Sequence, residues 1–398
     1  MNANNNKEKL EKYGNILFIC IIMLIFVVGF IRTVFCPKDM NYYENRYSNK
    51  ISVPTISTIL DNTFQSSIED ALSDQIPLAQ HLKKLYNEST TSFSDYFITT
   101  IIENNRTTYI NYKNKSKIFD GYYVFGKYDI EYVKRQFQVK ADNYNEIFEK
   151  YPNIEFYAYY IEKDTDMNFE SGEKIHADEY LFSILNLDDC RTRSFKIENF
   201  QEFSDYFYKT DHHWKHTGAY VAYKDIVELL GCEEEPIKAG KEVLISKEFM
   251  GSHSSTAGSK IISEPFYAYE FKFPKFKKIT GSQNDGDYGL QEDLIATAPV
   301  TSISYGQFYG SDDGKLIFDT GKTNLDNILV IGNSYDNAIL KLLATHFNKT
   351  HSIDLRNYEH FEGRKFNFQQ YVEENSIDKV LFVGNIDFYA SEAFELGN

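Results

Sequence analysis

Short apolar strands alternate with helices between residues 327 and 383, and this alternation constrains the fold of the chain more than any other feature. The pattern predicts strands at 327–331, 352–355 and 379–383, with helices at 337–347 and 366–374 between them. Strands separated by single helices at this spacing form βαβ units, which place the strands parallel in one sheet. We therefore expect an α/β fold with a parallel sheet flanked by helices.

The region before this alternation divides into several further segments. Residues 55–104 repeat apolar side chains at every fourth position and predict helix, with Pro77 as an interruption. Residues 130–150 read as an amphipathic helix, and 154–161 as a buried strand. Residues 237–320 are rich in Gly and Ser, and we interpret them as an insertion of irregular or β structure.

An apolar run near the N-terminus predicts a membrane span. Residues 16–35 are twenty residues interrupted by a single Arg32, which is about 30 Å as a helix and enough to cross a bilayer. A signal peptide is the alternative, because Lys7, Lys9 and Lys12 precede the run. No small-residue cleavage site follows it, so we favour an uncleaved anchor. Positive charges on the two sides barely differ, and we expect the long C-terminal part to lie outside the cytoplasm.

These patterns divide the chain into three parts. Residues 1–36 would be a cytoplasmic tail and transmembrane anchor, 37–110 a stalk and helical lead-in, and 111–398 the main domain. The formal charge of −16 argues against a nucleic-acid partner, since phosphate binding needs clustered basic residues. Cys190 and Cys232 are the cysteines of the soluble part, and a disulfide and two free thiols remain equally open.

A serine occupies the turn after one predicted strand. Ser334 follows the apolar run 328–331 and the residues Gly332 and Asn333. In a parallel sheet, ligands bind outside the carboxyl ends of the strands. The next helix would direct free backbone N–H groups to this place, where they and the Ser334 N–H can stabilise an oxyanion. The alternative is that Ser334 only caps that helix.

The segment Asp211-His212-His213-Trp214 supplies groups that could complement a serine. His213 can act as a base if Asp211, two positions away in a turn, orients its second ring nitrogen, and Trp214 could fix the imidazole. A helix-entry loop with solvated histidines is the simpler interpretation. A metal site is a third, because His216 adds to the cluster, although the aspartate-rich motifs that metal-dependent phosphoesterases need are missing.

Residues 210–214, Thr-Asp-His-His-Trp, resemble the signature of the DHHW protein family. That family is similar to the SGNH-like acyltransferases that O-acetylate alginate and other exopolysaccharides, where an Asp-x-His-Trp motif precedes a strand ending in Gly-x-Ser-Tyr, as at 332–335. The N-terminal span, Glu44-Asn45-Arg46, Asp74-x-x-Pro77 and Asp120-Gly121 also fit the pattern. Leu78 and Ala79 depart from it, since a basic residue is expected after the proline, and Glu162 stands where a proline often precedes Lys163.

The resemblance implies an SGNH-hydrolase-like architecture, with residues 111–398 as the catalytic domain. It also implies a serine triad in which Asp211 orients, His213 is the base and Ser334 is the nucleophile, without a metal or cofactor. Weaker candidates for oxyanion or substrate contacts are Trp214, Tyr335, Arg356 and Asn385.

The function implied is that of a membrane-anchored, extracytoplasmic serine O-acyltransferase of the cell envelope. We expect acetyl as its group and a cell-surface or exported polysaccharide as acceptor, with a membrane partner as a source of the acyl donor. An esterase would use the same covalent intermediate. The alternative is a non-catalytic scaffold that binds or assembles polysaccharide on the same fold.

Overall fold

The computed structural model describes most of the chain in two compact units. The described residues are 2–38, 40–41, 46–60, 62–75, 85, 107–109, 117–249, 251–257, 262–280, 283–287, 290–310 and 312–396. One unit contains residues 1–99 with 255–259, and the other contains 100–254 with 260–398.

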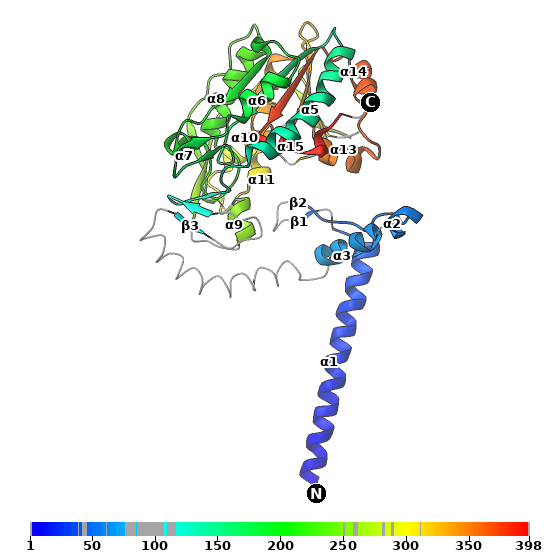
Figure 1. Cartoon of the computed structure of the whole chain (residues 1–398). Coiled ribbons are helices and arrows are strands. Elements are labelled where there is room, and N and C mark those ends of the chain that lie inside the picture. Colours follow the sequence, from blue (N-terminus) through cyan, green and yellow to red (C-terminus); the bar gives the residue numbers. More distant parts are fainter. Residues whose placement is uncertain are drawn as a thin grey trace. The chain divides into compact units, whose positions relative to one another are not determined.

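A long helix begins the N-terminal unit (Figure 1). Helix α1 runs over Asn2–Phe35, and its part Lys12–Phe35 is long and apolar enough to cross a membrane. No second helix of this kind occurs among the described residues. The apolar segment is therefore one continuous helix, as the sequence predicted, and its length and composition suit both an anchor and a signal sequence.

The polar ends of two side chains organise the rest of this unit. Strands β1 (Met40–Asn41) and β2 (Arg46–Tyr47) pair antiparallel, and helices α2 (Ile56–Leu60) and α3 (Thr63–Gln75) follow. Buried Gln75 accepts a hydrogen bond from Lys38 N and donates one to Lys38 O, while Asp74 accepts one from Asn49 N. These bonds fasten the chain after α1 to the end of α3.

The helix predicted over 55–104 is found only in part. Asn62, with a left-handed φ of 64°, separates α2 from α3. Asparagine tolerates this conformation better than most residues, so it ends one helix and allows the next to begin. The expectations for Pro77, the segment 78–84 and the residues Glu44 and Asn45 lie outside the described residues.

A large mixed sheet forms the centre of the C-terminal unit. In the described part of the chain its eight strands have the order β13-β12-β14-β16-β15-β17-β6-β9. The five strands from β16 to β9 are parallel, and β14, β12 and β13 continue the sheet antiparallel at one edge. The strands are β6 (Glu155–Ile161), β9 (Thr192–Phe195), β12 (Lys277–Thr280), β13 (Gln283–Asp287), β14 (Lys315–Asp319), β15 (Asn327–Gly332), β16 (Lys349–Ile353) and β17 (Lys379–Gly384).

Helices cover both faces of this sheet (Figure 1). Alternate residues of the central strands point to opposite faces, with Leu329 and Phe382 in one apolar core and Val330 and Val383 in the other. The first core contains α5 (Ile130–Lys150), α6 (Ala177–Ile184), α13 (Leu355–Glu362), α14 (Phe368–Asn375) and α15 (Ile386–Ala390). The second contains α7 (Phe200–Tyr206), α8 (His216–Leu229), α11 (Tyr305–Tyr309) and α12 (Asn337–Leu343). The result is a three-layer α/β arrangement.

Short elements connect these layers. The turn Asp120-Gly121, with positive φ at both residues, joins β4 (Lys117–Phe119) to β5 (Tyr122–Val124), and β3 (Thr107–Tyr109) pairs with β4. Two further hairpin-like pairs are β7 (Met167–Asn168) with β8 (Glu173–Lys174), and β10 (Glu242–Phe249) with β11 (Glu264–Tyr269). The remaining elements are α9 (Ser252–Ala257), α10 (Leu290–Thr297) and the short 3-10 turns Asp189–Arg191, Ala344–His346 and Glu392–Phe394.

Three expectations need correction. The strand predicted at 352–355 is β16, which begins at Lys349 and pairs with β14 and β15 along its whole length. Helix α13 follows it at once, where the sequence suggested only one later helix. Residues 237–320 contain strands as expected, but β12, β13 and β14 belong to the main sheet and are no separate insertion. The four cysteines, all within the described residues, are free thiols.

Candidate active site

The turn after β15 presents Ser334 at the carboxyl end of the parallel strands. A Cβ at Gly332 would come within 2.6 Å of Asp336 Oδ2 and 2.9 Å of Val383 O, so only glycine fits where the strand ends. Ser334 is partly exposed, and its Oγ lies 2.7 Å from His213 Nε2. The N-cap of α12 is Asp336. Ser334 therefore contacts the histidine and is not the capping residue.

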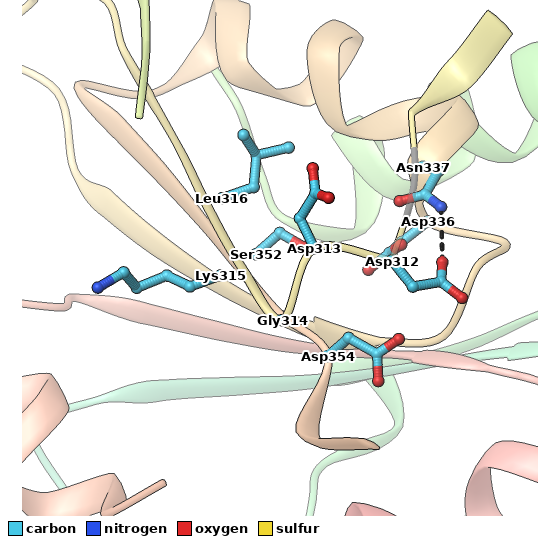
Figure 2. A pocket seen from close by; sticks show the side chains of 9 residues that line it. All are labelled: Asp312, Asp313, Gly314, Lys315, Leu316, Asp336, Asn337, Ser352 and Asp354. Carbon is cyan, nitrogen blue, oxygen red and sulfur yellow. Dashed lines mark hydrogen bonds between the residues drawn. The ribbon is translucent and has the colours of Figure 1, made fainter. Parts of the chain in front are cut away.

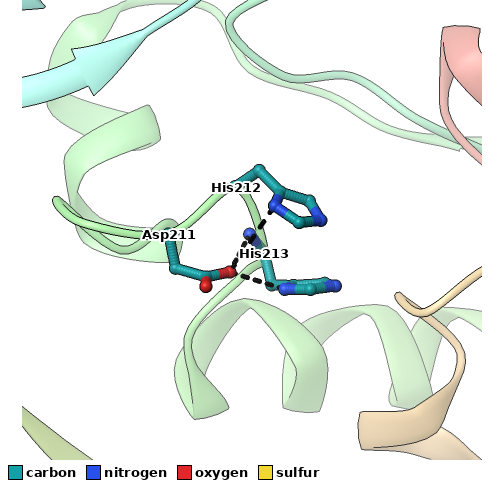
Figure 3. Close-up of side chains that lie close together, drawn as sticks. All are labelled: Asp211, His212 and His213. Carbon is teal, nitrogen blue, oxygen red and sulfur yellow. Dashed lines mark hydrogen bonds and ion pairs between the residues drawn. The ribbon is translucent and has the colours of Figure 1, made fainter. Parts of the chain in front are cut away.

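The loop between α7 and α8 brings His213 to this serine. The loop closes on itself through Lys215 N, which donates to Tyr206 O at 2.6 Å, and through Tyr208 N, which donates to His213 O at 3.2 Å. Asp211 Oδ1 accepts hydrogen bonds from the His213 backbone N–H at 2.9 Å and from its ring Nδ1 at 2.5 Å (Figure 3). With Nδ1 protonated toward the carboxylate, Nε2 is left to accept the serine proton.

The carboxylate of Asp211 sits in a tight backbone cradle. Its Oδ2 accepts a hydrogen bond from Ser252 N at 2.7 Å, and a Cβ at Gly251 would approach Asp211 Cβ to 2.3 Å. Burial alone would raise the pKa of Asp211, but the contact with His213 and the Ser252 N–H hold that pKa well below its usual range. Asp211 is thus ionised and fixed in one orientation.

A tyrosine that the sequence analysis did not single out packs flat against the base. The Tyr305 ring is parallel to the His213 imidazole, with an interplanar angle of 3° and 3.8 Å between ring centroids. Tyr305 begins α11, where Ser304 and Gln307 form a capping box, a short-range pattern visible in the sequence. That pattern predicts where a helix starts, but it carries no information about which residue the tyrosine meets.

Trp214 and Tyr335 pack against each other next to the proposed triad. Both side chains are buried, at 0% and 1% exposure, so neither ring faces solvent in this structure. Trp214 lies edge-on against Tyr335, with centroids 5.5 Å apart, and the Tyr335 hydroxyl donates to the carbonyl of His212. These two rings therefore tie the histidine loop to the serine turn.

Asn385 and Arg356, the two remaining candidates, lie at the same edge of the sheet. Buried Asn385 caps α15 and accepts a hydrogen bond from Asn333 Nδ2 at 3.1 Å, so its amide orients the residue before Ser334. The Arg356 guanidinium donates to Asp354 at 2.6 Å and to Asp312 at 3.0 Å.

Figure 2 shows the small acidic pocket that contains these aspartates together with Asp336. Burial, and then the neighbouring Asp354 and Asp312, raise the pKa of Asp336 well above its usual range. Close to the serine turn, Asp336 therefore favours its neutral form over a third negative charge.

Asp211, His212 and His213 also offer three ligand atoms within 4.8 Å of one another, the arrangement that the metal interpretation needs. In this structure both imidazoles use Nδ1 for other contacts. His213 Nδ1 meets Asp211, and His212 Nδ1 lies 2.7 Å from Ser252 Oγ. A metal bound through these atoms would break both hydrogen bonds, so the residues fit a hydrogen-bonded chain better than an ion.

The fold and this geometry define a mixed α/β protein with a serine, a histidine and an aspartate in one hydrogen-bonded chain. The sequence profile of the DHHW protein family matches residues 140–353, more than half of the chain. The chain belongs to the DHHW family, as the residues 210–214 indicated. A search of curated protein sequences found no match.

Solved structures share the fold at low sequence identity. PatB1 of Bacillus cereus, solved with a sulfonyl adduct, is 17% identical with a TM-score of 0.53, over 70% of this chain and 98% of that one. A second structure of PatB1 is 20% identical with a TM-score of 0.51, over 73% and 100%. A DHHW family protein from Eubacterium siraeum is 18% identical with a TM-score of 0.51, over 71% and 96%.

Proposed function

We propose that the protein is a serine O-acyltransferase or esterase of SGNH-like type, with Ser334 as nucleophile, His213 as base and Asp211 as the orienting carboxylate. The observation that carries this proposal is the chain of contacts from Asp211 Oδ1 to His213 Nδ1 at 2.5 Å and from His213 Nε2 to Ser334 Oγ at 2.7 Å. A non-catalytic scaffold has no need of this alignment, which catalysis requires.

In the first half of the reaction, Ser334 Oγ attacks the carbonyl carbon of an acyl donor while its proton passes to His213 Nε2. The tetrahedral intermediate carries a negative oxygen, and we assign the Ser334 backbone N–H as a donor that stabilises it. Collapse of the intermediate expels the leaving group, which takes the proton from His213. An acyl ester on Ser334 remains. The ionised Asp211 stabilises the imidazolium formed on the way.

In the second half, a hydroxyl compound loses its proton to His213 Nε2 and attacks the ester carbonyl. The acyl group moves to the new oxygen, and Ser334 recovers its proton from the histidine. A sugar hydroxyl makes the enzyme a transferase, and water makes it an esterase. We propose a cell-surface or exported polysaccharide as acceptor and acetyl as the group, with a membrane partner that delivers the donor.

The position of the catalytic unit in the cell is part of the proposal. We propose that α1 is an uncleaved anchor, because the twenty residues 16–35, apolar apart from Arg32 and Thr33, match a bilayer and no small-residue cleavage site follows them. The C-terminal unit would then lie outside the cytoplasm. A reporter active only in the cytosol, fused to the C-terminus, should stay silent, and its activity would refute this topology.

The test of the enzymatic role is turnover of a chromogenic acetyl ester by the full chain and by three variants. Ser334→Ala and His213→Ala should remove turnover above the uncatalysed rate, and Asp211→Asn should reduce it by roughly 10³–10⁴-fold. Circular dichroism checks that each variant remains folded. Equal turnover in Ser334→Ala and wild type would refute the serine mechanism, and a folded wild type without turnover would favour the scaffold.

A further inference from the structure

An open cleft of about 580 Å³ begins next to the serine turn. Its lining includes Tyr128, Tyr132, Asn333, Arg356, Asp387 and Phe394. Asn333 directly precedes Ser334, and Asn385 at the end of β17 holds the Asn333 amide at 3.1 Å. The cleft therefore lies at the carboxyl edge of the parallel strands, where α/β proteins bind their ligands.

The cleft combines aromatic surface with hydrogen-bonding groups. Tyr132 projects from α5 with 46% of its surface exposed. The Tyr128 hydroxyl donates to Asp387 Oδ1 at 2.8 Å, and the Arg356 guanidinium lies over the Phe394 ring at 5.3 Å. A pyranose has apolar C–H faces and hydroxyl groups around its edge. The aromatic rings of this lining can pack against the C–H faces, and its polar side chains can hydrogen-bond to the hydroxyl groups.

The charges of the lining compensate one another. Arg356 is bonded to Asp354 at 2.6 Å and to Asp312 at 3.0 Å. Asp387 has Lys163 at 3.6 Å. The lining itself thus holds one basic and one acidic side chain, Arg356 and Asp387, and each is paired with residues of opposite charge, which leaves no unpaired positive charge for a polyanion. A uronate-rich glycan would find no unpaired positive charge here to balance its carboxylates, whereas an uncharged one would meet oriented donors and acceptors.

We propose that this cleft is the acceptor site, and that it binds an uncharged oligosaccharide chain with Tyr132 as a stacking surface. The choice of a saccharide rests on the proposed acyl transfer. The openness of the cleft suits a chain longer than one sugar, and the hydrogen bonds of Tyr128 and Arg356 hold the contact groups in place before the ligand arrives.

Binding is measured by isothermal titration calorimetry on the full chain in phospholipid nanodiscs. Detergents are avoided because their sugar headgroups would compete with the oligosaccharides for the cleft. The probes are cellopentaose and chitopentaose as uncharged chains and pentameric mannuronate as an anionic chain. No acyl donor is present, so binding is read without turnover. The variants are Tyr132→Ala, which removes the stacking surface, and Ala390→Trp, which places a bulky ring in the lining. Phe361→Ala, at an aromatic 40% exposed on α13 and outside the lining, is the matched control.

We expect an uncharged pentasaccharide to bind more tightly than the mannuronate pentamer. Tyr132→Ala should weaken that binding roughly tenfold, the loss of one aromatic contact. Ala390→Trp should abolish it, and Phe361→Ala should leave it within about twofold. Preference for mannuronate, no binding of either uncharged chain, or equal effects of Tyr132→Ala and Phe361→Ala would overturn the inference. Acylation of Ser334 is measured separately, so an acyl-enzyme without cleft binding refutes only this site, and cleft binding without an acyl-enzyme refutes only the catalytic proposal.

Discussion

Replacement of Gly251 by alanine should disable the site although it replaces none of the three proposed triad residues. The added Cβ would lie 2.3 Å from Asp211 Cβ, 2.5 Å from Thr210 O and 2.7 Å from Asp211 Cα. Two of these atoms belong to the backbone, so no flexible side chain can swing away. Ordinary contact needs about 3.4 Å between carbon atoms. Asp211 must therefore move by about 1 Å (3.4 − 2.3) relative to Gly251.

A shift of that size breaks the geometry on which His213 depends. The Asp211 Oδ1 to His213 Nδ1 distance is 2.5 Å, and an added 1 Å takes it to the limit of a hydrogen bond. Misplacement by about 1 Å costs roughly 10²-fold in rate, and loss of the orienting carboxylate costs about 10⁴-fold in the serine-protease template. We expect kcat/KM for an acetyl ester to fall by about 10²–10⁴-fold, or about 3–5 kcal/mol of transition-state stabilisation.

The assay is ester turnover with thermal unfolding measured in parallel. Overpacking in Gly251→Ala should also cost about 1–3 kcal/mol of stability. The control variant must therefore lose stability while Asp211 and His213 stay in place. Gly172→Ala serves, because Gly172 has a φ of 72° and open space around it, which gives a backbone strain of about 1 kcal/mol. Turnover by folded Gly251→Ala within threefold of wild type would refute the reasoning that Asp211 must keep this position.

Three further predictions follow from individual contacts. Tyr305→Phe keeps the ring stacked on His213 and should retain ester turnover within about threefold, whereas Tyr305→Ala should lose roughly 10–100-fold; equal rates would show that the ring does not position the base. Burial lowers the pKa of His351 from 6.5 to about 3. Below pH 6.5 the unfolded chain therefore binds a proton that the folded chain does not, and stability falls by about 1.4 kcal/mol per pH unit down to pH 3. Urea unfolding measures the free energy of unfolding at pH 7 and at pH 5. The decrease between the two should be about 2 kcal/mol smaller in His351→Gln than in wild type, and equal decreases would contradict the lowered pKa of His351. Asn385→Ala removes both a helix cap and the support of Asn333, so it should cost about 1–2 kcal/mol of stability and also reduce turnover; Asn367→Ala, which removes only the cap of α14, should cost stability alone.

The parallel core could be predicted from sequence because its strands are apolar on both faces. Leu329 and Val330 enter opposite cores, and a continuous apolar run is the mark of a strand buried in this way. The start of β16 could not be predicted in this way. Lys349, Thr350 and His351 read as polar loop, yet they pair with β14 and β15 on both sides. The buried His351 is accommodated by the hydroxyl of Tyr371 at 2.8 Å, a partner that no local pattern reveals.

The catalytic candidates were visible because their motifs are local, while their surroundings come from distant parts of the chain. Asp211 and His213 are two residues apart in a loop, and Ser334 ends a predictable strand. Tyr305, Gly251 and the Ser252 N–H come from the region interpreted as an insertion, and only the folded chain places them against the histidine and aspartate. The burial of the Trp214 and Tyr335 rings is likewise a property of the folded chain that residue type alone does not indicate.

Mass spectrometry of the protein is the most direct test of whether Ser334 forms a covalent acyl-enzyme. The full chain is exposed to a chromogenic acetyl ester, quenched in acid and digested to locate the added mass. We expect one acetyl group on the peptide that contains Ser334, absent in Ser334→Ala and strongly reduced in His213→Ala. An acetyl group on another residue, or an equal adduct in Ser334→Ala, would contradict it.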